Sequence, residues 1–147
     1  MTLLDTNILA RLCDTSSPHH RAAADAVALL HSRGEMTVVC SQNMIEFYSI
    51  ATRPRNGLGL SHPQAITAMM DIERRFHMLH ELPLHDAWKK LIVKYTITGR
   101  IVFDLKLVAA AATGGCASIL TFNDQDFLDF SEISVVNPFD LLGLARA

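Results

Sequence analysis

The stretch LLDTNIL at residues 3–9 decides the expected fold. Two leucines run directly into Asp5, and the residues after it begin a helical pattern. An acid that follows a buried strand lies at the carboxyl end of that strand, where open α/β sheets bind their ligands. Aspartate is also a favoured N-cap residue, so Asp5 could serve only to begin the helix. The stretch therefore predicts an α/β fold and leaves Asp5 with either a ligand-binding or a purely structural role.

Short strand-like runs alternate with longer helical segments along the rest of the chain. The helix signals include a capping box at residues 61–64 and glycines that end helices at Gly34 and Gly114. This alternation is typical of a parallel sheet with helices on both faces. We therefore predict a three-layer α/β/α sandwich with a central parallel sheet, in a single domain over residues 1–147. The strands are expected at residues 2–4, 36–40, 77–81, 117–120 and 133–136.

The composition is that of a compact globular chain. Of the 147 residues, 50% are hydrophobic and 19% are charged, which excludes a disordered tail. The formal net charge of −2 excludes a generally basic nucleic-acid coat, so any polyanion must bind a local patch. With no long apolar run and no signal-peptide pattern, we expect a cytoplasmic protein that does not bind membranes. The three dispersed cysteines are expected to be small core residues rather than zinc ligands.

Acidic residues recur where strands end or helices begin. Asp5 follows the first strand, Glu46 lies early in the helix after the second strand, and Asp104 lies at the start of a later helix, near residues 103–104. In a parallel sheet these positions converge on one edge. Each acid alone could be a helix cap or a surface charge, but their joint placement favours a shared site. Carboxylates packed together raise one another's pKa, and a hard cation such as Mg²⁺ or Mn²⁺ stabilises them.

The order and spacing of these motifs resemble the PIN-domain ribonucleases and, more narrowly, the VapC-type toxins of bacterial type II toxin–antitoxin pairs. The resemblance covers nearly the whole chain. It implies a metal-dependent endoribonuclease that cuts RNA phosphodiesters by attack of water, with Mg²⁺ or Mn²⁺ as cofactor and an antitoxin protein as partner. It rests on LLDTNIL, on MIEF at residues 44–47, on a small-residue helix from Asp104, on LTFNDQDF at residues 120–127, and on ATRP at residues 51–54 and VNP at residues 136–138.

The resemblance assigns the metal-binding acids residue by residue. They are Asp5, Glu46 and Asp104, which are therefore also predicted to be catalytic. The segment FDLK at residues 103–106 departs from the His-Asp-Ala-Arg that is common in close relatives. This departure could alter packing or RNA entry, but it keeps the acid.

The fourth acid of the family falls on an amide in this chain. The matching position, two residues after Thr121, is Asn123. This leaves Asn123 or Asp126 to complete the site. We predict Asp126 as the fourth catalytic acid, because its step to Phe127 fits the Asp-Phe of the family better than Asp124 does.

Neighbouring polar and basic residues have candidate supporting roles. Four could orient the acids or a water: Thr6, Asn7, Thr121 and Asn123. Helix capping is an equally good explanation for Thr6 and Asn7, as is a structural hydroxyl for Thr121. Three basic residues are candidates to contact RNA phosphates: Arg53, Arg55 and Lys106. An ordinary surface charge also explains Arg55. None of the seven histidines has a ligand spacing, so we expect no histidine general base.

Two other classes of protein fit part of the pattern. Phosphatases that form an aspartyl phosphate also use an acid after the first strand, but they need a second acid where this chain has Asn7. The stronger alternative is a non-catalytic PIN-like protein that binds RNA or an antitoxin, which the substitution at Asn123 keeps open. A homodimer is also expected, with an apolar stripe near Met69, Met70 and Ile72 as one candidate interface.

Overall fold

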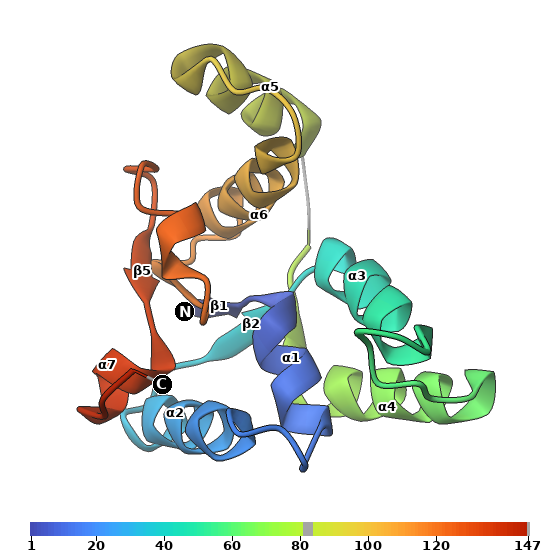
Figure 1. Ribbon diagram of the computed structural model, residues 1–147. Coiled ribbons are helices and arrows are strands. Elements are labelled where there is room, and N and C mark those ends of the chain that lie inside the picture. The colour runs from blue at the N-terminus through green and yellow to red at the C-terminus, as the bar shows by residue number, and fades with distance from the viewer. Residues whose placement is uncertain (81–83, 147) are drawn as a thin grey trace.

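The computed structural model describes residues 1–80 and 84–146 and contains one parallel β-sheet (Figure 1). Its strand order is β3-β2-β1-β4-β5, and all four neighbouring pairs are parallel. In the centre, Leu3 is in register with Val38 on one side and Ile119 on the other. The strands are β1 (Thr2–Leu4), β2 (Thr37–Val39), β3 (His77–Met78), β4 (Ser118–Leu120) and β5 (Ser134–Val136).

Helices cover both faces of this sheet, which confirms the predicted three-layer sandwich. One face packs against α1 (Thr6–Cys13), α2 (His20–Ser32), α3 (Ser41–Thr52), α4 (His62–Arg75) and the short α7 (Pro138–Leu142). The opposite face packs against α5 (Leu84–Tyr95) and α6 (Ile101–Thr113). A single 3₁₀ turn, η1 (Asp124–Asp126), follows β4. In the part of the chain that the structure describes, no helix is long and apolar enough to span a bilayer.

The two cores follow from the period of two in a strand. Leu3 packs against the α5–α6 layer, and the next residue, Leu4, packs against the opposite layer. Because successive strand residues point to opposite faces, continuous apolar runs supply both cores at once. This is why the strands show no polar alternation in the sequence.

The order of the strands places a crevice at the carboxyl ends of β1 and β4. From β1 the chain proceeds to β2 and β3 on one side, and later to β4 and β5 on the other. Such a switch point is where open α/β sheets bind ligands, because the connections diverge and leave the strand ends uncovered. The residues that follow these two strands, Asp5 and Thr121, are both buried at this point.

Several elements differ from the sequence prediction. Helix α6 begins at Ile101, so Asp104 lies at its fourth residue rather than at its start. The turn that precedes it contains Gly99 at φ +70°, a backbone conformation that favours glycine. The third strand is limited to residues 77–78, and residue 81 of the predicted strand lies outside the described residues.

One prediction of burial was wrong. Cys13 is exposed at the end of α1, whereas Cys40 and Cys116 are buried as predicted. The candidate dimer stripe is only partly at the surface, since Ile72 is buried and Met70 is exposed. The period of the helix explains this difference, because residues two positions apart on a helix face different directions.

Shortening Leu3 to alanine should destabilise the protein by about 3 kcal/mol, since it leaves a cavity in the central strand. Leu3 is fully buried, whereas Met36, just before β2, is 53% exposed. The matched Met36→Ala variant should therefore change the free energy of unfolding by less than about 0.5 kcal/mol. Urea denaturation of both variants measures the difference, and equal effects would contradict this account of the core.

Candidate functional site

Asp5 lies at the centre of the site, directly after β1. It is 8% exposed, and two side chains donate hydrogen bonds to its Oδ2. The Thr121 hydroxyl donates at 2.6 Å and the Asn7 amide at 2.8 Å. The Asn7 amide also donates to the Thr121 Oγ1 at 2.9 Å, which closes a three-residue network. This network joins the ends of β1 and β4 and fixes the direction of the Asp5 carboxylate.

Glu46 is held in the same way by neutral donors from two helices. Its Oε2 accepts a hydrogen bond from the Thr6 hydroxyl at 2.7 Å, and its Oε1 accepts one from the Gln42 amide at 2.7 Å. The Gln42 amide also donates to the backbone carbonyl of Phe103 at 3.0 Å. The amide of buried Asn43 donates to the Thr6 Oγ1 at 3.3 Å. Glu46 is thereby linked to α1 through Thr6 and to α6 through Gln42.

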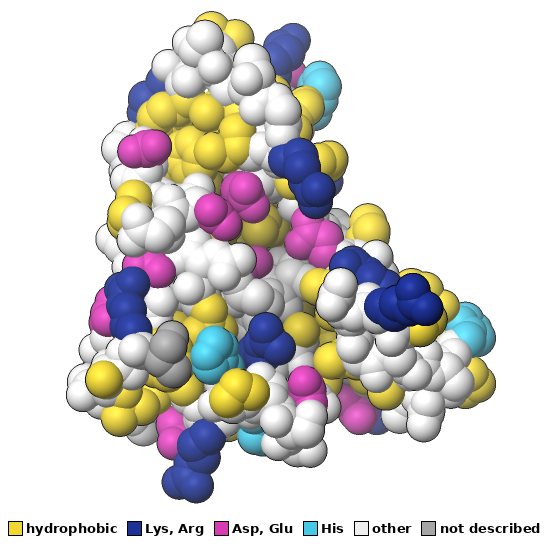
Figure 2. Space-filling view, in the orientation of Figure 1, with side chains coloured by type: hydrophobic (Ala, Val, Ile, Leu, Met, Phe, Trp, Pro, Cys, Tyr) yellow, Lys and Arg dark blue, Asp and Glu magenta, His cyan; other side chains and the backbone are white. Residues whose placement is uncertain are grey.

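Asp104 faces the other acids from the first turns of α6. Its pKa is raised to about 6, first by burial and then by the negative charges of Asp126, Asp5 and Glu46. The structure therefore brings all four predicted catalytic acids within electrostatic reach of one another. Asp126 is exposed at the end of η1 and has the largest effect of the three charges. Figure 2 shows acidic side chains gathered in a hollow, with Lys and Arg side chains beside it.

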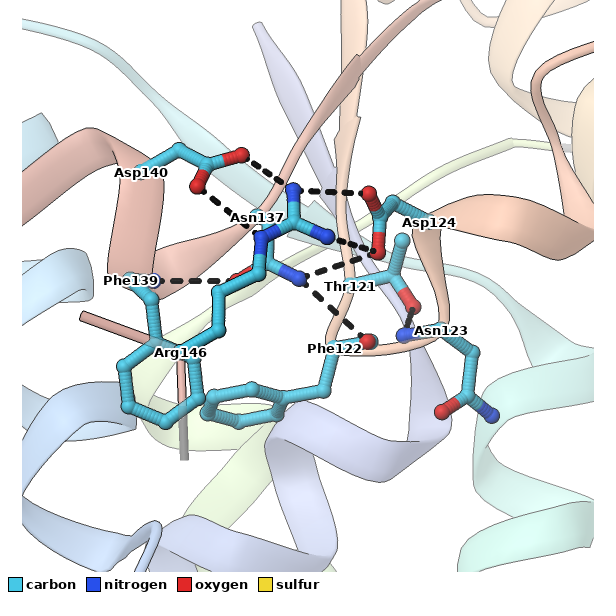
Figure 3. A network of polar contacts seen from close by, with 8 residues as sticks. All are labelled: Thr121, Phe122, Asn123, Asp124, Asn137, Phe139, Asp140 and Arg146. Atoms are coloured by element: carbon cyan, nitrogen blue, oxygen red, sulfur yellow. Dashed lines mark hydrogen bonds and ion pairs between the residues drawn. The ribbon is translucent and has the colours of Figure 1, made fainter. Parts of the chain in front are cut away.

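The neighbouring Asp124 is held away from this cluster by an ion pair (Figure 3). Its buried carboxylate lies 2.9 Å from the Arg146 guanidinium and accepts a hydrogen bond from Asn137 at 3.0 Å. Arg146 also pairs with Asp140 of α7. Since Asp124 is already neutralised by a basic residue, it is the poorer candidate for the fourth acid, and Asp126 is the acid that η1 leaves facing the site.

Asn123 does not take the place of an acid in the network around Asp5. Its side chain is exposed and points away from the Asp124–Arg146 ion pair (Figure 3). Only its backbone N–H contributes, donating to the Thr121 Oγ1 at 2.9 Å. The backbone of Asn123 thus helps to orient the Thr121 hydroxyl, which in turn orients Asp5.

Burial makes the charged form of Asp5 costly. Its pKa is raised from 3.8 to about 6, mainly by desolvation, with a smaller contribution from the charge of Glu46. The hydrogen bond from Thr121 acts in the opposite direction but does not cancel the effect. Two acids of one cluster, Asp5 and Asp104, therefore hold their protons to higher pH than ordinary aspartates. Clusters of this kind are typical of functional sites.

The donor set fits a hard divalent cation that keeps part of its water. The groups that converge are carboxylates, which Mg²⁺ and Mn²⁺ prefer. Within residues 1–80 and 84–146, no three His, Cys, Asp or Glu residues lie close enough to be direct ligands of one ion. Mg²⁺ usually takes only one or two carboxylates together with several waters, so an open cluster suits it. One buried acceptor beside Glu46, the Gln42 Oε1, has no hydrogen-bond partner among the described residues.

Basic residues flank the acids from two cavities. One, of about 480 Å³, is lined by Glu46 and Asp104 together with Arg53 and Arg100. The other, of about 520 Å³, lies between α1 and α3 and is lined by Arg11 and again by Arg53. Arg53 thus borders both cavities. The predicted Lys106 lines a third cavity between α5 and α6. Arg55 is exposed in the loop after α3 and lines none of these three cavities.

Sequence reasoning missed three of these residues, although a signal was available. Each missed residue lies four positions from a residue of the network, which is the spacing of neighbours on one helix face. Gln42 precedes Glu46 by four, and Arg11 follows Asn7 by four, within α3 and α1 respectively. Arg100, the N-cap residue of α6, precedes Asp104 by four. A search for polar residues at this spacing would have found all three.

The fold and the site together define an α/β protein whose acidic groups converge on the carboxyl edge of a parallel sheet. The PIN domain family model matches residues 2–133, and the chain belongs to this family. The predicted membership is thereby confirmed. No curated protein sequence gives a significant match to this chain.

Solved structures of toxin–antitoxin proteins share the fold at low sequence identity. VapBC2 from Rickettsia felis, bound to a promoter DNA fragment, matches with a TM-score of 0.70 and 15% identity over 92% of this chain and 97% of that one. A toxin–antitoxin complex from Klebsiella pneumoniae matches with a TM-score of 0.59 and 20% identity over 94% and 98%. VapC20 from Mycobacterium tuberculosis, a toxin that cleaves the sarcin–ricin loop, matches with a TM-score of 0.55 and 16% identity over 81% and 87%.

The raised pKa of Asp5 predicts that the metal-free protein loses stability as the pH rises. Between the unfolded pKa of 3.8 and the folded value of about 6, the folded state binds more protons than the unfolded state. The contribution of Asp5 to the free energy of unfolding therefore falls across this window, by up to about 3 kcal/mol, and is level above it. Asp104, whose pKa is also raised to about 6, contributes in the same direction, so Asp5→Asn should reduce this slope without abolishing it. Asp129→Asn, at an exposed aspartate, is the matched control.

The measurement is urea unfolding in EDTA at several pH values from 4 to 8. Addition of Mg²⁺ at the upper end should restore stability to the parent protein but not to Asp5→Asn. If the stability of Asp5→Asn relative to the parent protein does not increase between pH 4 and pH 6, the assigned direction of the Asp5 pKa is wrong.

Proposed function

We propose that this protein is a metal-dependent endoribonuclease and the toxin of a toxin–antitoxin pair. The observation that carries the proposal is the convergence of Asp5, Glu46, Asp104 and Asp126, two of which have pKa values raised to about 6. Membership of the PIN family supports a nuclease. The basic residues beside the acids, above all Arg53 and Arg100, suit a polyanionic substrate.

In this proposal Asp5, Glu46 and Asp104 would hold Mg²⁺ or Mn²⁺, one or two of them directly and the rest through the waters that the cation keeps. The bound cation supplies Lewis-acid stabilisation of the charge that develops on the attacking and leaving oxygens of the phosphodiester. The chain itself orients the acids through neutral donors: Thr121 and Asn7 for Asp5, and Thr6 and Gln42 for Glu46.

Asp126 has a different role in this proposal. It is exposed, and no side-chain hydrogen bond to it is seen among the described residues, so its carboxylate is available to accept a proton from the attacking water. Arg53 and Arg100 bind the phosphates on either side of the cut. Arg55 and Lys106 extend this contact along the strand.

We propose an antitoxin protein as the second partner, beside the RNA. We also propose that the protein acts in the cytoplasm. The fold likeness to the VapBC2 protein and to the Klebsiella pneumoniae complex supports this partner. We also propose a homodimer. Because Ile72 is buried, the apolar side chains of α4 that could form the dimer interface are those of Ile66 and Met70, which are 38% and 45% exposed.

The proposal is tested by incubating the purified protein with a pool of structured RNA in Mg²⁺, in Mn²⁺ and in EDTA, beside Asp104→Asn. We expect cleavage with either metal and none in EDTA or in the variant. RNA binding without cleavage by the parent protein would favour the non-catalytic PIN-like binder. Cleavage that survives EDTA would overturn the metal-dependent mechanism.

Asp126→Asn should lower the rate of cleavage at least about 100-fold. Loss of a group one shell away from a metal costs about 10- to 100-fold, and Asp126 is proposed to act directly. Asp129→Asn is the matched control, because it removes an equally exposed carboxylate three residues further along. It should cleave at the parent rate in the same assay. A fully active Asp126→Asn would remove Asp126 from the mechanism and leave three acids in the site.

A further inference from the structure

A largely apolar pocket lies beside the acidic site, between α5 and α6. Its volume is about 420 Å³, and we call it the aromatic pocket. Four of its six lining side chains are hydrophobic, and the two that are not, His85 and Lys106, can both donate hydrogen bonds. In Figure 2, hydrophobic side chains border the acidic hollow on the side of α5 and α6. The lining residues are Leu84, His85, Trp88, Val102, Phe103 and Lys106.

The two aromatic rings of the pocket differ in their surroundings. The Trp88 indole is fixed, because its Nε1 donates to the Val102 carbonyl at 3.0 Å. Phe103 is 58% exposed, which is unusual for a phenylalanine next to a buried core. An exposed aromatic face beside a fixed one provides a platform on which a flat ring can stack.

Phe103 connects this pocket to the acidic site. Its side chain lines both the aromatic pocket and the cavity that contains Glu46 and Asp104. Its carbonyl accepts the hydrogen bond from Gln42, the residue that also holds Glu46. Lys106 follows Phe103 by three residues and so lies on the same face of α6, one turn further along. Stacking surface, acid and cation are therefore presented by a single rigid helix.

We propose that the aromatic pocket binds a nucleobase of single-stranded RNA, next to the phosphate that lies at the acids. This inference rests on the proposed nuclease function and names the form of RNA that the site accepts. An unpaired base stacks on Phe103 and Trp88, and Lys106 binds the adjoining phosphate. Sequence-tolerant stacking on aromatic residues combined with a basic side chain is how proteins hold unpaired strands. A base within a duplex is already stacked and cannot enter, so the strand must be unpaired at this position.

The chemistry of the rim favours RNA over a protein segment. A peptide could offer apolar contacts and a carboxylate to Lys106, whereas a nucleotide offers a flat ring that matches the aromatic surface, polar base edges for His85 and a phosphate for Lys106. The base and its phosphate thus satisfy the apolar and the polar parts of the pocket together.

The single tryptophan of the chain makes the test direct, because Trp88 is the only source of indole fluorescence. The probe is a short oligoadenylate, titrated with Ca²⁺ in place of Mg²⁺ and confirmed by gel to remain intact. We expect saturable quenching of Trp88 emission. A matched strand with abasic residues should bind more weakly and cause little quenching, since it keeps the phosphates and lacks the bases.

Substitutions at Phe103 separate stacking from apolar area. Phe103→Leu should weaken binding of oligoadenylate about 10-fold, which corresponds to roughly 1.4 kcal/mol and lies within the range of base–aromatic stacking. It should leave the affinity for the abasic strand unchanged. Phe103→Tyr keeps the aromatic face and should bind nearly as the parent protein does. Met36→Ala, which removes an exposed apolar side chain before β2, is the control.

The outcomes distinguish the pocket from the nuclease function. If the parent protein cleaves RNA but Phe103→Leu binds oligoadenylate as tightly as Phe103→Tyr, the base-binding pocket is wrong and the nuclease stands. If the parent protein neither binds nor cleaves RNA, both proposals fall. If Trp88 emission changes with protein concentration alone and not with RNA, a second copy of the chain covers the pocket and the proposal is overturned.

Discussion

The placement of a buried carboxylate at the centre of the sheet constrains the rest of the structure. Asp5 cannot move away from the core, because it directly follows β1, the middle strand of the sheet. Burying a charge there is costly unless hydrogen bonds or a counter-charge compensate. The neighbouring strand end and the first turn of α1 supply two side-chain donors, Thr121 and Asn7, and backbone N–H groups, but no basic side chain. The compensation is incomplete, which is why the Asp5 pKa remains raised to about 6.

Neutral donors orient the acids without neutralising them. Threonine, asparagine and glutamine side chains surround Asp5 and Glu46, whereas Arg146 pairs with Asp124, outside the cluster. The acids of the cluster therefore still repel one another, whereas Asp124, which is paired with Arg146, adds little to this repulsion. A positive charge placed among such carboxylates would relieve their repulsion. The same geometry explains how a chain with a net charge of only −2 concentrates negative charge at one place.

The fold, and the gathering of the four acids at one edge of the sheet, could be predicted from the sequence because both depend on local patterns. Strand runs ending in an acid are visible in the chain, and parallel topology then brings the acids to one edge. Helix boundaries were less predictable: α6 starts at Ile101 because the preceding turn adopts a positive φ at Gly99, which no apolar period reveals. Contacts between distant side chains were the least predictable part.

The Asp124–Arg146 ion pair illustrates this last limit. It joins residues 22 positions apart, and nothing in the sequence distinguishes Asp124 from Asp126 by charge or composition. The resemblance to the PIN family favoured Asp126 through its step to Phe127, but it gave no physical reason. The reason lies in the packed structure, where Asn137 and Arg146, which flank α7 in the sequence, hold the Asp124 carboxylate.

The double role of Gln42 has a mechanical consequence. One amide nitrogen donates both to Glu46 in α3 and to the carbonyl of Phe103 in α6. The two helices belong to opposite layers of the sandwich, so this amide is a clamp across the edge of the sheet. A change in the distance between α3 and α6 would break the clamp and release one oxygen of the Glu46 carboxylate from its donor. The orientation of this acid therefore depends on the spacing of two helices as well as on its own neighbours.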